Sequence, residues 1–144
     1  SSNVTDTQTT INDPNLLPFR TAIANGVRYI MVSSAYYTRI DPRPGKIGPF
    51  STVVMNTMLR TNLGFKGVII SDDLCNAAQL SSWSWAVRAN NFFNAGGNML
   101  LCGNPNAIPY MSSAVQNLAQ SNPAFMAKIN ADVLRVLTAK AAGA

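Results

Sequence analysis

Two adjacent aspartates, Asp72 and Asp73, follow a short apolar run that ends in Ser71. A carboxylate at the exit of a buried strand is partly desolvated and has a second charge beside it, which favours nucleophilic or acid–base chemistry. Consecutive strand residues point to opposite faces, so only one of the two faces a ligand while the other bonds to backbone or to a neighbouring loop. An ordinary N-cap and turn, which aspartate also favours, is the alternative interpretation.

Polar residues also follow two other apolar runs, 27–33 and 98–102: Ser34, Tyr36, Tyr37 and Asn104. If all these runs are parallel strands, their carboxyl ends meet at one edge of a sheet, where ligands bind. A rim of hydroxyl, carboxylate and amide groups suits a neutral hydroxylated ligand such as a sugar. The rim carries no cluster of cations for a phosphate.

The amino-acid inventory excludes several kinds of chemistry. The chain has no His, and its six acidic residues are all Asp. This excludes a Ser-His-Asp triad, His-rich zinc sites and Glu-based acid–base pairs within the chain. Cys75 and Cys102 are too few for a four-thiolate site, and we interpret them as small buried residues rather than reactive thiols. A disulfide between them stays open, and we expect no metal and no organic cofactor.

Composition predicts one core-forming domain. The chain has 144 residues, 47% of them hydrophobic and 12% charged, with a net charge of +5. Its basic residues are scattered from Arg20 to Lys140, which predicts a mildly basic surface rather than a nucleic-acid site. No apolar stretch approaches the ~20 residues that span a bilayer, so we expect no membrane segment. The opening SSNVTDTQTT is not a signal peptide, so localisation is left unknown, with a secreted or cell-envelope location compatible.

Hydrophobic patterning predicts alternating strands and helices. The predicted strands are 27–33, 67–71 and 98–102, and the predicted loops are 1–15 and 34–50. Predicted helices cover 16–25, a segment after Ser51 that ends near Leu63, a segment between Ser82 and Gly96, 107–120, and a segment from Asn122 onward. Short, solidly apolar strands separated by helices are typical of a parallel sheet covered by helices. The strands are too few for a complete doubly wound sheet or (β/α)8 barrel.

Three stretches resemble glycoside hydrolase family 3, in its branch of single-barrel bacterial β-N-acetylhexosaminidases: LLPFRTAIANGVRYIMVSSAYYTRID, LR-x-x-LGF-x-GVIISDDL and NAGGNMLL. The second stretch is long and irregular, and it is the most specific. The resemblance runs from about residue 3 to 140 and implies an α/β fold, the C-terminal portion of a (β/α)8 TIM barrel that is incomplete on its own. Residues 1–15 would be the loop after barrel strand five, and 16–144 would supply the last helices and strands six to eight.

The resemblance also implies roles for individual residues. Asp72 corresponds to the nucleophile of a retaining mechanism that hydrolyses terminal β-glycosidic bonds, in a β-N-acetylhexosaminide or a β-glucoside. Asp6 would be the acid/base or its orienting partner. The expected pocket walls are Ser34, Tyr36, Tyr37, Asp73 and Asn104.

The sequence departs from the family pattern at three places. Gln8 stands where the branch has its acid/base His, Ser34 where a His is common, and Asn98 where an Asp is common. We therefore do not restrict the expected substrate to N-acetylglucosaminides and keep other β-glycosides as candidates. Because strands before the sixth are not in the sequence, we expect the isolated chain to be inactive. We expect it to pair with the N-terminal part of the barrel or to self-associate through open strand edges.

The sequence leaves two alternatives to a glycoside hydrolase. A non-catalytic carbohydrate-binding or structural fragment fits the departures at Gln8 and Ser34. A nucleotide- or phosphate-binding domain needs a glycine-rich turn from a strand into a helix. Gly96 and Gly97 instead precede a strand, which disfavours that last function.

Overall fold

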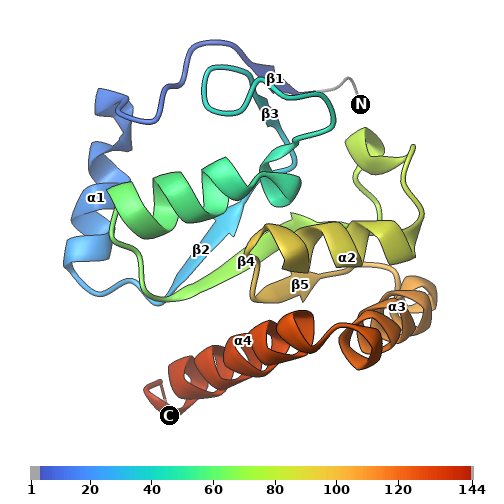
Figure 1. The fold of residues 1–144 in the computed structure, drawn as a ribbon. Helices are drawn as coiled ribbons and strands as arrows, with labels where there is room; N and C mark the ends of the chain where they lie inside the picture. Colours follow the sequence, from blue (N-terminus) through green and yellow to red (C-terminus); the bar gives the residue numbers. More distant parts are fainter. Residues whose placement is uncertain (1–3, 144) are drawn as a thin grey trace.

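The computed structural model describes residues 4–143, and over this range a three-stranded parallel sheet has the order β2-β4-β5. The strands are β2 (Tyr29–Val32), β4 (Val68–Asp73) and β5 (Met99–Leu101). Met31 pairs with Ile70, and Ile70 pairs with Met99 across the sheet (Figure 1). The predicted parallel α/β arrangement is confirmed for the described residues. Residues 1–3 of the predicted N-terminal loop lie outside them.

Helices occupy the segments before, between and after these strands. They are α1 (Leu17–Ala24), the π-helix Val53–Asn62, α2 (Trp85–Ala95), α3 (Ile108–Ser121) and α4 (Pro123–Ala141). The Ser51 hydroxyl accepts from the Val54 amide at 3.1 Å, and the Asn122 side chain accepts from the Phe125 amide at 3.1 Å. Gly96 ends α2 with a φ of 118°, a conformation that favours glycine. The helix α2 begins later than predicted, with Ser84 as its N-cap.

The predicted loops 1–15 and 34–50 are wrong in part. Short strands β1 (Thr5–Asp6) and β3 (Tyr36–Tyr37) pair in parallel inside these segments. One-turn helices also form at Pro14–Leu16 and Gly48–Phe50. Two-residue strands are too short to show a period of two, and their partner lies far along the chain, so the local pattern carries no signal for them.

The core lies on one side of the sheet. Ile69 of β4, Met55 of the π-helix and Phe92 of α2 are all 0% exposed there. Figure 1 shows these helices in front of the strands. On the other side, Met31 of β2 is 56% exposed. Leu134 of α4, near the amino ends of the strands, is 65% exposed. The described residues thus leave an apolar face open, which in soluble proteins marks a contact surface.

A buried polar network joins the amino ends of the strands to two helices. The Asn98 side-chain oxygen accepts from the Arg60 guanidinium at 2.7 Å and from the Ile69 amide at 2.8 Å. Its NH2 group donates to the Asp132 carboxylate at 2.7 Å, and Lys128 pairs with the same carboxylate. Burial lowers the pKa of Arg60 to about 10. This network fixes α4 and the π-helix against the sheet.

Replacing Asn98 tests the network. We expect Asn98→Ala to lower the free energy of unfolding by about 2 to 4 kcal/mol, because it leaves buried donors and an acceptor without partners. Urea unfolding measures the change, and Asn94→Ala on the exposed end of α2 is the matched control. Equal stability of the two variants would contradict the role of the network.

A second polar cluster fixes the segment before the π-helix. Asp41 is 4% exposed and accepts two hydrogen bonds from the Arg43 guanidinium, each 2.7 Å long. It also accepts from the Ser51 hydroxyl at 2.6 Å and from the Arg43 backbone amide at 3.4 Å. The hydrogen bonds from Arg43 lower the pKa of Asp41 to about 2, against the opposing effect of burial. The ionised carboxylate is therefore the form that the fold stabilises.

This shift makes stability depend on pH. A folded-state pKa below the unfolded value contributes stability above about pH 4 that is lost as the pH falls toward 2. Because the Arg43 side chain is 52% exposed, we discount the contribution to about 1 kcal/mol. Urea titrations of wild type and Asp41→Asn should differ near neutral pH and converge on acidification. A difference that grows with acid would refute this account.

Candidate functional site

A hollow of about 360 Å³ opens at the carboxyl ends of β2 and β4. Its polar lining groups are Ser33, Ser34, Asp72, Asp73, Asn76 and Gln79. The remaining lining residues are Val4, Ala35, Ala77 and Ala78, all of them apolar. A small cavity with hydroxyl and amide groups and two carboxylates in its wall suits a neutral hydroxylated ligand better than an anion.

Asp72 lies at an irregularity of β4. The strand places one more residue than β5 between the pairs Ile70–Met99 and Asp73–Leu101, so it bulges at this point. The Ser71 hydroxyl accepts from the Leu101 amide at 2.9 Å across the bulge. Bulges are common beside active sites because they change the direction of a side chain.

The Asp72 carboxylate retains accepting capacity. It accepts the amide of its neighbour Asp73 at 2.8 Å, and no other hydrogen bond reaches it within residues 4–143. Ser34, across the hollow, is 5% exposed, and its hydroxyl has no partner in the same part of the chain. Buried polar atoms in native proteins are nearly always paired, so an unpaired hydroxyl beside a free carboxylate indicates a ligand site.

Asp73 has a different environment although it is adjacent. One oxygen accepts from the amides of Cys75 at 2.9 Å and Gly103 at 3.1 Å, and the other accepts from the Asn76 side chain at 2.8 Å. Burial alone would raise the pKa of Asp73, but these hydrogen bonds outweigh it and the pKa lies below its ordinary value. The sequence predicts one ligand-facing and one structural aspartate, and the contacts identify Asp73 as the structural one.

Asp6 does not face the Asp72 hollow. Its carboxylate accepts from the Thr9 hydroxyl at 2.6 Å and from the amides of Thr9 and Gln8, each at 2.8 Å. The hydrogen bond from the Thr9 hydroxyl is the main cause of a lowered pKa at Asp6. Asp6 and Tyr37 line a second hollow of about 310 Å³ between the N-terminal segment and β2. The two hollows share Ser33, whose hydroxyl hydrogen-bonds the Tyr37 hydroxyl at 2.7 Å.

The other predicted pocket residues also lie apart. Tyr36 is half-buried against the core, and the Asn104 side chain accepts from the Asn106 amide at 3.1 Å to cap a one-turn helix. The structure thus brings together Ser34, Asp72 and Asp73 only. Ser33, Asn76 and Gln79 also line the hollow and were not among the predicted site residues. Their signal is their position as polar residues in the same two exit loops.

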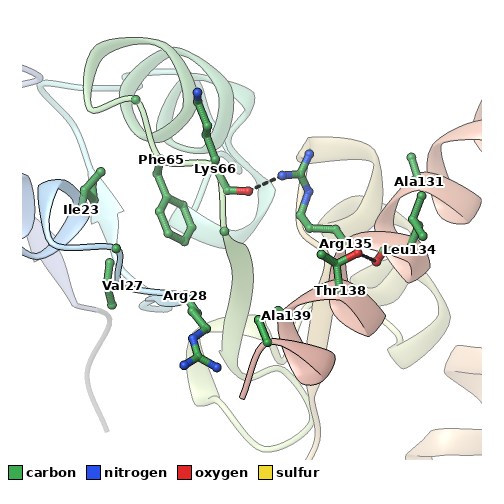
Figure 2. Close-up of a pocket in the computed structure, with 14 residues that line it drawn as sticks. Ile23, Val27, Arg28, Phe65, Lys66, Ala131, Leu134, Arg135, Thr138 and Ala139 are labelled. Atoms are coloured by element: carbon green, nitrogen blue, oxygen red, sulfur yellow. Dashed lines mark hydrogen bonds between the residues drawn. The ribbon is translucent and has the colours of Figure 1, made fainter. Parts of the chain in front are cut away.

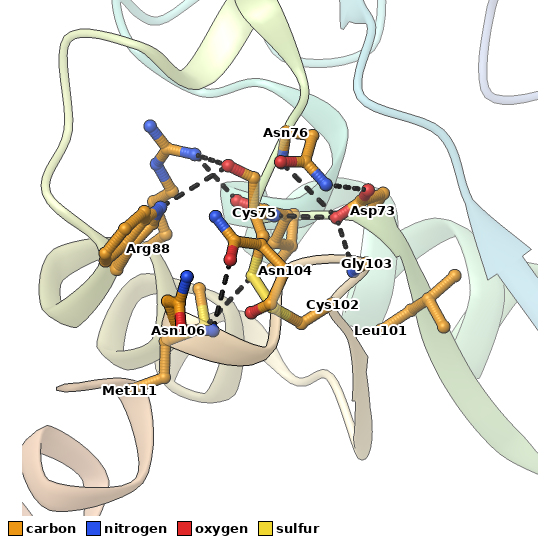
Figure 3. The surroundings of a disulfide bond; sticks show 12 residues. Asp73, Cys75, Asn76, Arg88, Leu101, Cys102, Gly103, Asn104, Asn106 and Met111 are labelled. Atoms are coloured by element: carbon orange, nitrogen blue, oxygen red, sulfur yellow. Dashed lines mark hydrogen bonds between the residues drawn. A yellow bond between two sulfur atoms is a disulfide. The ribbon is translucent and has the colours of Figure 1, made fainter. Parts of the chain in front are cut away.

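The two cysteines form a disulfide between adjacent exit loops (Figure 3). Cys75 follows β4 and Cys102 follows β5, with their Cα atoms 5.1 Å apart. The sequence left this pairing open, although two cysteines at the exits of neighbouring parallel strands are near in space. Their sequence separation is 27 residues, for which the chain-entropy model gives about 3 to 4 kcal/mol of stabilisation.

A larger hollow, of about 840 Å³, lies at the opposite ends of the strands. Arg28, Lys66 and Arg135 line it, and Arg135 donates to the Lys66 carbonyl (Figure 2). It contains none of the residues that the sequence predicted for a site. Within residues 4–143, no cluster of metal-ligating side chains is found and no helix is long and apolar enough to span a membrane.

Comparison with known proteins defines the family. Residues 1–139 match the family model described as the glycosyl hydrolase family 3 N terminal domain. The chain therefore belongs to glycoside hydrolase family 3, and the predicted family is confirmed.

Within this family, the chain is similar to several proteins named as hexosaminidases. The chain is 38% identical to a beta-hexosaminidase of Nitrosomonas eutropha over 117 residues, 81% of this chain and 32% of that protein. It is 36% identical to a beta-hexosaminidase of Methylococcus capsulatus over 74% of this chain and 31% of that protein. The crystal structure of a beta-N-acetylhexosaminidase from Beutenbergia cavernae superposes with a TM-score of 0.91 at 35% identity, covering 98% of this chain and 41% of that one. The chain spans about a third of the length of these curated relatives.

Proposed function

We propose that Asp72 is the nucleophile of a retaining hydrolase of terminal β-glycosidic bonds, with a β-N-acetylhexosaminide or a β-glucoside as substrate. One observation carries the proposal: a carboxylate with unused accepting capacity lines a small polar hollow at the carboxyl end of the middle strand. Membership of the family and similarity to proteins named beta-hexosaminidase support the substrate class.

The reaction has two balanced steps. An Asp72 oxygen attacks the anomeric carbon, the glycosidic C–O bond breaks, and the departing oxygen takes a proton from an acid. Water then attacks the glycosyl ester, gives its proton to the same group and restores the carboxylate. The Ser34 hydroxyl, together with Asn76 and Gln79, would bind sugar hydroxyls at the wall of the hollow.

We further propose that the chain is the C-terminal portion of a (β/α)8 barrel. In this arrangement β2, β4 and β5 would be barrel strands six, seven and eight, and residues 4–15, which include the short strand β1, would follow strand five. The parallel order of the strands and the partial coverage of longer relatives support it. The open apolar face at Met31 would then contact the earlier strands.

The lowered pKa of Asp6 favours its orienting role over proton transfer, because an acid must hold its proton near neutral pH. Tyr37, in the same hollow as Asp6, and Tyr36 and Asn104, nearby in the exit loops, would contribute outer walls once the barrel is complete.

A non-catalytic carbohydrate-binding role is the second candidate, and a specific observation favours it. Apart from Asp72, the only titratable group lining the hollow in the described residues is Asp73, whose pKa is lowered. Gln8, which stands in the place of the expected acid, cannot exchange a proton. The acid would therefore come from outside these residues, and without it only binding remains.

Covalent trapping separates these candidates. In the completed barrel, an activated fluoroglycoside of β-glucose or β-N-acetylglucosamine should add one sugar mass to the peptide that contains Asp72. An activated leaving group needs no acid, so the test reports the nucleophile alone. Asp72→Asn should abolish the adduct, since an amide oxygen is a poor nucleophile.

Asp13→Asn is the matched control, because Asp13 only caps a short exposed helix. The fluoroglycoside should label the Asp13→Asn variant at the wild-type rate. Sugar binding by wild type without any adduct would favour the non-catalytic role, and an adduct on another residue would reject Asp72.

The isolated chain provides a separate prediction. We expect it to show no turnover of an aryl β-glycoside, because the remaining walls of the hollow are missing. Light scattering should show self-association through the open edges of β2 and β5. Adding a polypeptide with the preceding barrel strands should yield a one-to-one complex and restore turnover. Turnover by the chain alone, abolished by Asp72→Asn, would overturn this expectation.

A further inference from the structure

Two links join the exit loops of β4 and β5 next to the candidate site. The first is the covalent bond between Cys75 and Cys102. The second is the Asp73 carboxylate, one oxygen of which accepts the amides of both Cys75 and Gly103 (Figure 3). The amides belong to one of the bonded cysteines and to the residue after the other. Both links therefore join the same short stretches of the two loops, one at Cys75 and the other at residues 102–103.

A buried cation completes this arrangement. Arg88 of α2 is 7% exposed, and one nitrogen of its guanidinium donates to the carbonyls of Leu74 and Cys75, each at 2.8 Å. A second nitrogen donates to the Trp83 carbonyl at 2.8 Å. The backbone after Asp73 is thus held by a helix on one side and by the β5 exit loop on the other.

Asp72 depends on these links because the sheet does not fix it. It lies in the bulge between Ile70 and Asp73, where the regular pairing with β5 is interrupted. Its one hydrogen bond within the described residues comes from the Asp73 amide at 2.8 Å. Any displacement of Asp73 therefore moves the donor that orients the Asp72 carboxylate.

We propose that the Cys75–Cys102 disulfide and the Asp73 carboxylate together form a clamp that positions Asp72, so that catalysis requires the oxidised protein. The inference rests on the proposed function of Asp72. Neither cysteine lines the Asp72 hollow, so both are positioning residues. Reduction adds two electrons and two protons to give two thiols, and a dithiol reductant supplies both as it closes to a cyclic disulfide.

Reduction of the disulfide removes the covalent link between the exit loops of β4 and β5. After reduction, hydrogen bonds alone join the two loops: the Asp73–Gly103 contact and the Leu74 amide, which donates to the Leu101 carbonyl at 3.1 Å. Water competes with exposed hydrogen bonds such as the first of these. Disulfides persist in oxidising compartments, so the clamp stays closed there and opens under reducing conditions.

The test uses the completed barrel and two independent measurements. Amide hydrogen exchange at Cys75 and Gly103 reports the clamp itself, and the rate of turnover of an aryl β-glycoside reports the site. The comparison covers oxidised and reduced wild type, C75S/C102S, Asp73→Asn, and Asp13→Asn as the control carboxylate outside the site.

We expect reduction, C75S/C102S and Asp73→Asn each to speed exchange at these amides and to lower kcat by about 100-fold, the scale for a misplaced catalytic group. For reduction and C75S/C102S, KM should change by much less, since neither cysteine lines the hollow. Re-oxidation of wild type should restore kcat, C75S/C102S should not respond to reductant, and Asp13→Asn should match wild type. If the double variant does not fold, reduction and re-oxidation of wild type make the same comparison.

Three results would overturn the clamp. Wild-type kcat in C75S/C102S would show that the disulfide does not position Asp72. A fall in kcat with unchanged exchange at Cys75 and Gly103 would show that it acts elsewhere. A proportional loss in the control variant would indicate general destabilisation. Failure of oxidised wild type to form any fluorosugar adduct would instead reject the proposed function, and the positioning role with it.

Discussion

The buried side-chain amide of Asn98 is the interaction on which the arrangement of sheet and helices depends. It accepts from the Ile69 amide and the Arg60 guanidinium and donates to Asp132, while its own backbone amide donates to the Ile69 carbonyl at 3.0 Å. Only a group with both donors and acceptors can satisfy these partners together. An aspartate at this position would face the Asp132 carboxylate with a like charge. This explains why the departure from the family pattern at Asn98 is compatible with the fold.

The two ends of the sheet consequently differ in how fully their polar groups are satisfied. At the amino ends, Arg60 also donates to the carbonyls of Phe65 at 2.9 Å and Gly67 at 2.7 Å. At the carboxyl ends, the Ser34 hydroxyl has no partner within residues 4–143. Unpaired buried groups lower stability, so proteins retain them mainly where a ligand will pair with them. Within the described residues, the Ser34 hydroxyl and the Asn90 side-chain oxygen are the buried side-chain atoms without a partner, and only Ser34 lines a hollow at the carboxyl ends.

The repeating order of elements could be predicted from sequence because it depends on local signals. Short apolar strands, the caps Ser51 and Asn122 and the glycine at 96 gave the helices and strands to within a few residues. The pairing of β1 with β3 could not be predicted, since each strand has two residues and their contact is long-range.

The candidate site was less predictable, and the aspartate pair shows why. Asp72 and Asp73 are chemically identical and adjacent, and their spacing says only that they face opposite ways. Their roles are set by the bulge at Asp72 and by the amides of Cys75 and Gly103 around Asp73. Both depend on how β4 pairs with β5, which a single chain segment does not encode. An irregularity of one residue in the sheet therefore separates the Asp73 carboxylate, which is bonded through both oxygens, from the Asp72 carboxylate, which keeps accepting capacity.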